Sequence, residues 1–270
     1  MAKFDFVEAA ASGYRYVWKE RRALLPLAIL PLGVKMGSYA GIYLMDIGDN
    51  VLRQGLVLLP AHLMEGFVVA LAIRMAMFGE RYDGLFTSGQ KEIYSQERRR
   101  AIMAGVVTYL IIKLVVSLLA GGSMIAQAYE TSTTLPKPTP SGEIYVTTLM
   151  VMIFGIWAFR FFWLYVPAAM GIPAGVFLVR IRGFMTSVYI AGFWMLCFVP
   201  MAVLLIAAAK MLMGVFPGPE AGIASPIYSM VMAIVQPVIE LVIALTSSVG
   251  MAYAVRAIMS EPQRPPRSPR

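Results

Sequence analysis

Four ionisable side chains fall near the middle of long apolar stretches of the sequence: Lys35, Glu65, Lys113 and Glu240. If these stretches are helices that cross a bilayer, each charge lies ~14–20 Å from one end of its helix, near the centre of a hydrocarbon core ~30 Å thick. An unpaired charge at that depth costs ~2.5–3.5 kcal/mol on insertion scales. We therefore expect the two lysines and the two glutamates to pair with one another or to be neutralised.

Two further polar residues accompany the glutamates at helical spacing. His62 precedes Glu65 by three residues and Gln236 precedes Glu240 by four, so each pair shares one helix face. In such a candidate intramembrane polar site, a glutamate could titrate and a lysine could serve as its counter-charge or bind an anion. A balanced set of charges could equally fix the register of the helices. The sequence leaves both interpretations open.

Helices in a membrane must position these side chains. The 270 residues are 59% hydrophobic and only 14% charged, and the mean hydropathy is +0.71, which excludes a soluble domain and a disordered chain. A spanning helix needs about 20 predominantly apolar residues. Six stretches meet this requirement: 24–45, 56–78, 101–124, 145–164, 188–212 and 227–251. The sequence therefore predicts an all-α integral membrane protein with six transmembrane helices.

The basic residues alternate between the two sides of these spans. Net charge is +8, and 16 of the 23 lysines and arginines fall in residues 1–22, 79–100, 165–187 and 252–270. Because positive residues stay in the cytoplasm during insertion, both termini are predicted to be cytoplasmic. The loops are too short for a nucleic-acid-binding fold, so the charge indicates anionic lipid headgroups as partners and excludes nucleic acid. The expected headgroup anchors are Arg21, Arg22, Arg98, Arg99 and Arg100.

The chain divides into three parts. Residues 1–22 place aromatic and apolar side chains at helical spacing, which predicts an amphipathic helix lying in the membrane interface; a helix packed on the loops is the alternative. Residues 23–255 form the predicted six-helix membrane domain. Residues 256–270 are basic and proline-rich and are expected to be a disordered tail. Within the membrane domain, residues 166–179 are too short to span and are expected to be interfacial or re-entrant.

Small residues, prolines and arginines give further expectations for the spans. Gly33, Gly37 and Gly41 form two overlapping GxxxG steps, for which close packing within the bundle is favoured over packing against a second copy. Prolines inside the first, fifth and sixth spans each remove a helix hydrogen bond; broken helices beside charges are typical of transporters, but proline is also common in membrane helices. Arg74 and Arg160 lie near predicted inner ends and are expected to extend to lipid headgroups.

The residues needed for common enzyme chemistries are missing. The sequence has one histidine, one cysteine (Cys197) and no His-Glu-x-x-His, Gly-x-Ser-x-Gly or P-loop motif. Paired methionines near the predicted outer face suit Cu(I), but methionine is a routine gap-filler in apolar cores. We therefore expect no metal, no cofactor and no enzymatic activity.

Two regions resemble a family. Residues 4–31, an aromatic amphipathic helix that runs through Trp18-Lys-Glu-Arg-Arg into a Leu/Pro-rich span, are similar to the start of a group of uncharacterised bacterial inner-membrane proteins. That group is related to the membrane domain of glycerophosphoryl diester phosphodiesterases. The Arg160-Phe-Phe-Trp-Leu-Tyr-Val-Pro167 segment resembles the family's junction before its fifth span, and Gly79-Glu80-Arg81 also fits.

The resemblance implies a bacterial inner-membrane location. It transfers no catalytic residue, and the phosphodiesterase barrel, which needs roughly 250 residues, is absent. One departure is that Arg180-Ile-Arg182 stands five residues before Ser187, where the family has a basic–Ser helix.

Two classes of function follow. The first is a non-enzymatic accessory or scaffold factor for envelope lipids or membrane proteins, with a membrane-protein partner or a homo-oligomer. The alternative is a small transporter or channel that uses the mid-membrane charges.

Overall fold

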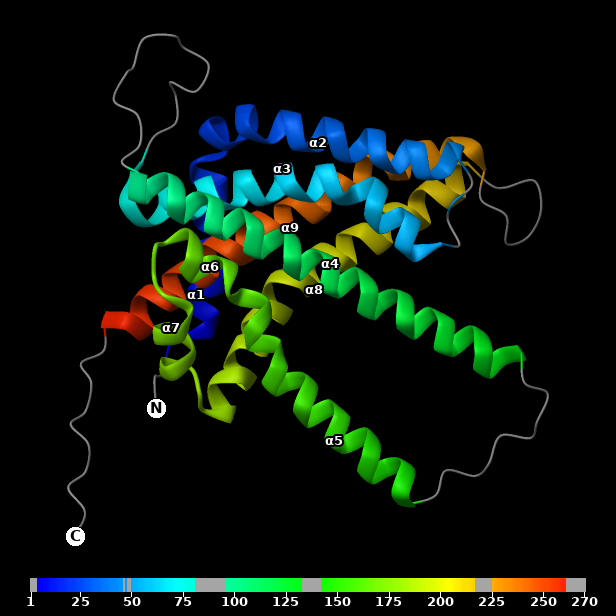
Figure 1. The fold of residues 1–270 in the computed structure, drawn as a ribbon. Helices are drawn as coiled ribbons and strands as arrows, with labels where there is room; N and C mark the ends of the chain where they lie inside the picture. The colour runs from blue at the N-terminus through cyan, green and yellow to red at the C-terminus, as the bar shows by residue number, and fades with distance from the viewer. Residues whose placement is uncertain are drawn as a thin grey trace.

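Every regular element that the structure describes is a helix. The computed structural model describes residues 4–45, 47, 50–80, 96–132, 142–216 and 225–260. Six stretches of helix are long and apolar enough to cross a membrane, as predicted. Figure 1 shows most of the long helices running side by side. The helices are α1 (Phe6–Lys19), α2 (Arg21–Leu44), α3 (Val51–Phe78), α4 (Gln96–Ser132), α5 (Gly142–Ala158), the 3-10 helix η1 (Phe159–Trp163), α6 (Tyr165–Ala169), α7 (Ala174–Arg180), α8 (Phe184–Val215) and α9 (Pro226–Ser260).

Local signals in the sequence set several helix ends. Asp5 caps α1 by accepting from the backbone N–H groups of Val7 and Glu8, and Asn50 caps α3 through the N–H of Arg53. Gly79 ends α3 at a φ of 66°, a left-handed conformation that glycine adopts without a steric penalty.

Some predicted boundaries differ from those observed. Helix α9 extends to Ser260, past residue 255, where the tail was expected to begin; residues 261–270 lie outside the described part of the chain. Residues 133–141, which are rich in threonine and proline, also lie outside it.

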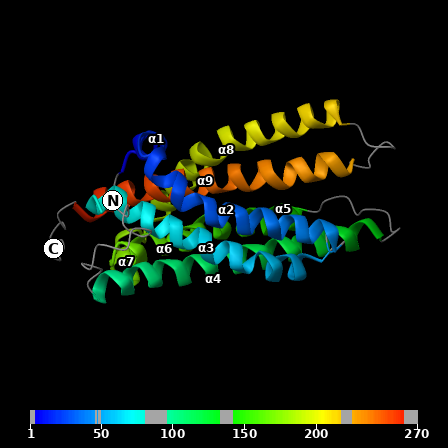
Figure 2. The same ribbon diagram turned by 90° about the horizontal axis from the view of Figure 1, so that it is seen from above.

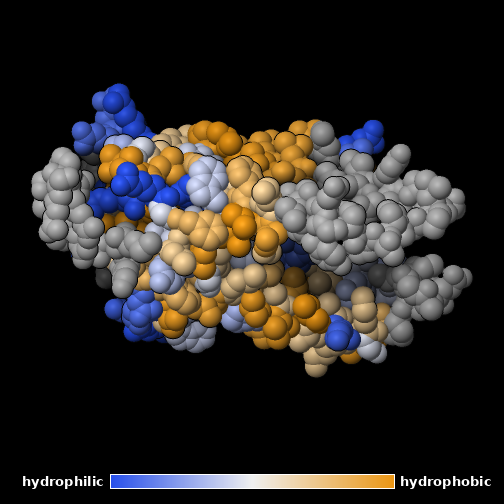
Figure 3. All heavy atoms as spheres, turned by 90° about the horizontal axis from the view of Figure 1, so that it is seen from below, coloured by the Kyte–Doolittle hydropathy of each residue, from blue (hydrophilic) through white to orange (hydrophobic). Residues whose placement is uncertain are grey.

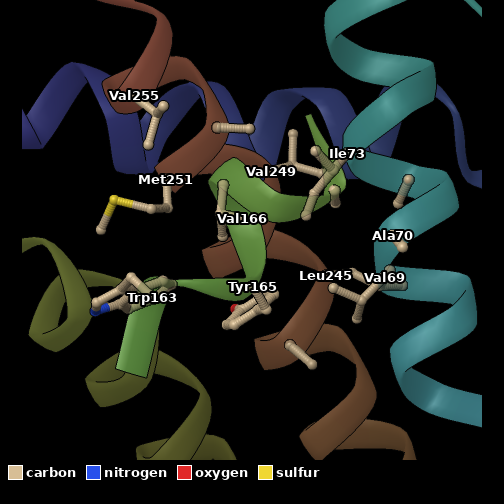
Figure 4. Close-up of a cluster of buried hydrophobic side chains, with 14 of the residues drawn as sticks. Val69, Ala70, Ile73, Trp163, Tyr165, Val166, Leu245, Val249, Met251 and Val255 are labelled. Carbon is tan, nitrogen blue, oxygen red and sulfur yellow. The ribbon is translucent and has the colours of Figure 1, made fainter. Parts of the chain in front are cut away.

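The core lies where α3 meets α6 and α9. Six consecutive α3 residues, Val68 to Ile73, are at most 3% exposed, so this part of α3 is apolar and buried all round. Figure 4 shows Tyr165 and Val166 of the short middle segment lying between side chains of α3 and α9. The segment expected to be interfacial or re-entrant thus forms two short helices, α6 and α7, and α6 is buried in the bundle.

The fourth span is the discontinuous one. Helix α5 gives way to the 3-10 turn η1, and α6 then continues into the core. By contrast, α2, α8 and α9 continue without a break through Pro31, Pro200 and Pro237. These prolines therefore do not give the broken helices that are typical of transporters, and they match the alternative that proline is common in membrane helices.

Glycine does bring helices into close contact, but not at the predicted positions. A Cβ added at Gly105 of α4 would lie 2.8 Å from the Cβ of Ala169, and one at Gly250 of α9 would lie 2.7 Å from the carbonyl oxygen of Ala9. At Gly33 and Gly37 of α2 an added Cβ meets no atom of the described residues within 4 Å. At Gly41 it meets only Met45, at the end of the same helix. The prediction that the GxxxG face packs within the bundle is therefore wrong, because this face of α2 points away from the other described helices.

The N-terminal helix α1 packs on the bundle. Its small residues Ala9, Ala10 and Gly13 are buried against α9, and the Tyr14 hydroxyl donates to the backbone carbonyl of Cys197 on α8 at 2.7 Å. Burial, together with the nearby Cys197 thiol, raises the pKa of Tyr14 to about 12. Figure 2 shows α1 beside α8 and α9. The opposite side of α1 stays exposed, with Trp18 at 72%.

The described surface has a broad apolar middle. In Figure 3 orange side chains cover the centre of the visible face, and blue hydrophilic ones gather mainly toward its two ends. Figure 1 places α1 and the C-terminal end of α9 at the same end of the bundle, as an even number of spans requires.

Candidate functional site

Lys35 of α2 is the centre of the buried charge cluster. Its Nζ donates to Glu65 Oε2 of α3 at 2.7 Å and lies 2.8 Å from Glu240 Oε2 of α9. The Lys35 side chain is 2% exposed and that of Glu65 is 1% exposed. One ammonium group therefore bridges two carboxylates and ties three helices together.

Glu65 is held from several sides. Besides Lys35, it accepts from the Tyr109 hydroxyl of α4 at 2.6 Å through Oε1. His62 Nδ1 lies 3.6 Å from Oε2, and Lys113 Nζ lies 3.7 Å from Oε1. His62 Nδ1 is buried and has no hydrogen-bond partner in the described part of the chain. The short bonds thus come from Lys35 and Tyr109, and the other two groups are longer-range neighbours.

Both carboxylate oxygens of Glu240 also have close partners, although the side chain is 29% exposed. Its Oε1 accepts from Gln236 Nε2 at 2.8 Å and from the Tyr39 hydroxyl at 3.0 Å. Gln236 Nε2 also lies within hydrogen-bond distance of the Tyr39 oxygen, at 3.2 Å. With Lys35 on Oε2, both oxygens of Glu240 have partners inside the bundle. Lys35 and Lys113 together balance the charges of Glu65 and Glu240.

Lys113 of α4 differs from Lys35 in having no close acceptor. Among the described residues its nearest carboxylate oxygen is the one at 3.7 Å on Glu65, and its Nζ lies 5.4 Å from the centre of the Tyr109 ring. The side chain is 31% exposed. An ammonium group has three donors, so Lys113 keeps hydrogen-bonding capacity that the protein does not use.

Lys113 and Glu240 both line a cavity of about 440 Å³. Residues of α4, η1, α6, α8 and α9 form its walls, and most of them are apolar or aromatic. The size lies within the range usual for ligand pockets, ~300–1,000 Å³. Val116, which also lines the cavity, is 42% exposed, so the cavity reaches the apolar outer surface of α4.

The structure brings all six predicted polar residues into one region. Sequence reasoning found the charges but missed Tyr39, which bonds Glu240. It also did not foresee the bond of Tyr109, which shares a helix face with Lys113, to Glu65. Tyrosine at i+4 from Lys35 and at i−4 from Lys113 was the available signal, since such residues share a helix face.

Two arginines expected at headgroups are instead buried. Arg74 is 8% exposed, forms a two-point ion pair with Glu80 at 2.6 and 2.9 Å, and donates to the Ala169 carbonyl. Arg160 is 5% exposed, donates to the Ile181 carbonyl at 2.9 Å, and lies 4.3 Å from the Trp157 ring. The headgroup assignment was wrong for both, because Arg74 binds a carboxylate and a carbonyl inside the fold and Arg160 binds a carbonyl and stacks on an aromatic ring.

The other predicted anchors stay at the surface, with one difference. Arg21, Arg22, Arg99 and Arg100 are exposed, and Arg21 stacks on Trp18 at 4.7 Å. Arg98 is half-buried and pairs with Glu80 at 2.7 Å, so Glu80 joins the start of α4 to the end of α3.

Comparison of the chain with models of protein families, with curated proteins and with solved structures gives no match. The resemblance to the membrane domain of glycerophosphoryl diester phosphodiesterases therefore stays a prediction. Among the described residues, no group of three or more histidine, cysteine, aspartate or glutamate side chains could hold a metal ion.

Proposed function

We propose that the protein is a non-enzymatic accessory factor for envelope lipids in the bacterial inner membrane, with both termini in the cytoplasm. The observation that carries this proposal is the cavity: an apolar, aromatic chamber that opens on the apolar surface of the spans. Such a chamber suits an amphiphile that enters from the bilayer.

The state of the buried charges favours this role over transport. Lys35, Glu65 and Glu240 use most of their hydrogen-bonding capacity on one another and on tyrosines, as a cluster that fixes helix register does. A group that carries a proton or an ion through the membrane has to exchange partners. In this cluster such an exchange would leave a buried charge uncompensated.

The alternating positive residues support the proposed orientation. Helix α1 would then lie at the cytoplasmic boundary, with its small-residue face on the bundle and exposed Trp18 available to the headgroup layer. In this arrangement α1 lies in the membrane interface and also packs on the protein.

Native mass spectrometry of the gently extracted full-length protein tests the proposal. We expect copurified lipid, with or without a protein partner. A monomer that carries neither lipid nor partner would contradict an accessory role.

A small transporter or channel is the second candidate, because one cation and one carboxylate face the cavity. Thermal stability that rises with one soluble solute and not with lipid would favour this alternative. Glu240→Gln should then abolish transport without lowering the amount of inserted protein; if all substitutions at the buried charges only lower that amount, their role is structural.

A further inference from the structure

We infer that the cavity beside Lys113 binds an amphiphile with an acidic headgroup, and that the ammonium group of Lys113 is the headgroup's counter-charge. This inference rests on the proposed function, because it names the site and the class of lipid. It depends on three features: the unused donors of Lys113, the occupied oxygens of Glu240, and the aromatic walls.

The first feature is the set of unused hydrogen-bond donors on Lys113. Lys113 lies near the middle of α4, where it lines the cavity, and its nearest carboxylate oxygen among the described residues is 3.7 Å away, beyond hydrogen-bond distance. The indole N–H of Trp163, in the same cavity lining, is buried and lacks a partner in the described part of the chain. A carboxylate or phosphate oxygen is the acceptor that suits an ammonium group in a medium without water.

The acidic side chain on the opposite wall does not forbid an anion. Both oxygens of Glu240 already accept hydrogen bonds, and Lys35 lies 2.8 Å from it. In the cavity it is therefore the ammonium group of Lys113 that keeps hydrogen-bond donors unused by the described residues, and an acidic headgroup is the acceptor that suits it. A zwitterionic headgroup would need an acceptor for its ammonium, and the Glu240 carboxylate is occupied.

The remaining walls suit an acyl chain. Phe159, Phe162, Trp194 and Phe198 supply aromatic surface, and Trp194 stacks on Phe198 with ring centroids 4.6 Å apart. Val116, at the edge of the cavity, is 42% exposed on a helix whose neighbouring Ile111 and Val115 are exposed as well. A chain can therefore pass from the hydrocarbon region into the cavity without crossing a polar surface.

Delipidated full-length protein in detergent allows a direct test. We would titrate phosphatidylglycerol, phosphatidylethanolamine and inorganic phosphate, and follow bound ligand by native mass spectrometry and stability by thermal unfolding. Phosphatidylglycerol is expected to bind and stabilise the protein more strongly than the other two. Equal binding of phosphatidylethanolamine would overturn the acidic specificity, and equal stabilisation by phosphate alone would identify a free anion in place of a lipid.

Three variants locate the site. Lys113→Met should weaken phosphatidylglycerol binding about tenfold or more, the usual effect of losing a hydrogen bond to a charged group. Lys113→Arg should retain binding. Val116→Trp should block the cavity from its exposed edge while the core keeps its packing. Lys210→Met is the matched control, because Lys210 is exposed on α8 and lies outside the cavity lining.

The outcomes separate the two proposals. Absence of copurified lipid from the wild-type protein would count against the lipid-accessory function itself. If phosphatidylglycerol binds wild type, Lys113→Met and Val116→Trp with the same affinity, lipid handling stands and the assignment of this cavity is wrong.

Discussion

Two mid-membrane lysines of this protein have different surroundings and therefore different roles. Lys35 is closed off between two carboxylates at 2.7 and 2.8 Å, whereas Lys113 lines a cavity and has no acceptor that close among the described residues. The same residue type at the same depth thus serves once as a structural bridge and once as an available cation.

Replacing Lys35 should therefore damage the fold far more than replacing Lys113. Lys35→Met leaves Glu65 and Glu240 facing one another without their shared cation, and breaking a buried ion pair in this way costs about 3–5 kcal/mol. We expect little folded protein in size-exclusion profiles and a lower melting temperature. Lys113→Met is the control, and it should stay folded because Lys35 and Tyr109 still hold Glu65. Equal melting temperatures for the two variants would refute the distinction.

At the residue scale, the sequence was sufficient to find the charges and to expect their pairing. It could not say which lysine takes which glutamate, because the pairing depends on how α2, α3, α4 and α9 are rotated against one another. The burial of Arg74 was missed for a similar reason. Its partners Glu80 and Ala169 come from a helix end and from the discontinuous fourth span, neither of which has a periodic signal.

Among the helices, the close contacts occur at glycines that do not belong to the GxxxG pattern. Gly105 and Gly250 lie where another backbone passes within van der Waals distance, and Gly33 and Gly37 face away from the bundle. Spacing along one helix shows that a close approach is possible, but only the partner helix determines where it occurs.

Alanine substitutions separate these glycines. Gly105→Ala puts a methyl group 2.8 Å from the Cβ and 3.0 Å from the Cα of Ala169, which must shift, so we expect a loss of about 1–3 kcal/mol in thermal unfolding. Gly37→Ala meets nothing within 4 Å and should be neutral, or stabilising by up to about 1 kcal/mol, because glycine is a poor helix former. If Gly37→Ala destabilises the protein in a concentration-dependent way, a second copy packs on this face of α2.

Attachment of α1 should depend on alkaline pH through Tyr14. Its pKa is about 12 when packed, against a usual value of about 10, so the packed state retains a proton that the free side chain loses. The stability that Tyr14 contributes is complete below pH 10 and is lost as the pH rises toward 12. Melting curves between pH 8 and 11 should show the advantage of wild type over Tyr14→Phe shrinking with pH. A constant difference would mean that this hydroxyl does not ionise with α1 packing.

Across the whole molecule, hydrophobicity and charge determine most of what is predictable. The six spans follow from composition and length, and six helices in the described part of the chain are long and apolar enough to qualify. The break in the fourth span was not predicted from the sequence, because η1 interrupts the helix among aromatic residues and contains no proline or glycine.

The topology can be measured with reporters. Fusions of a fluorescent protein at either terminus should be bright, and fusions of a periplasm-dependent phosphatase there should be inactive, since both termini are predicted to be cytoplasmic. A phosphatase inserted after Lys137 is the positive control, because that loop is predicted to be external. Opposite signals at the two termini would rule out an even number of spans.

The contacts of α1 have a consequence for biosynthesis. The first helix made packs on the last one, α9, and Glu240 of α9 is also the second partner of Lys35. Until the ribosome has delivered α9, the N-terminal helix lacks its main docking surface and keeps only contacts such as the Tyr14 bond to α8, and α2 carries an ammonium group with one carboxylate partner instead of two. Assembly can therefore finish only at the end of translation. A chain that stops before α9 would expose both defects at once and would therefore be a substrate for membrane quality control.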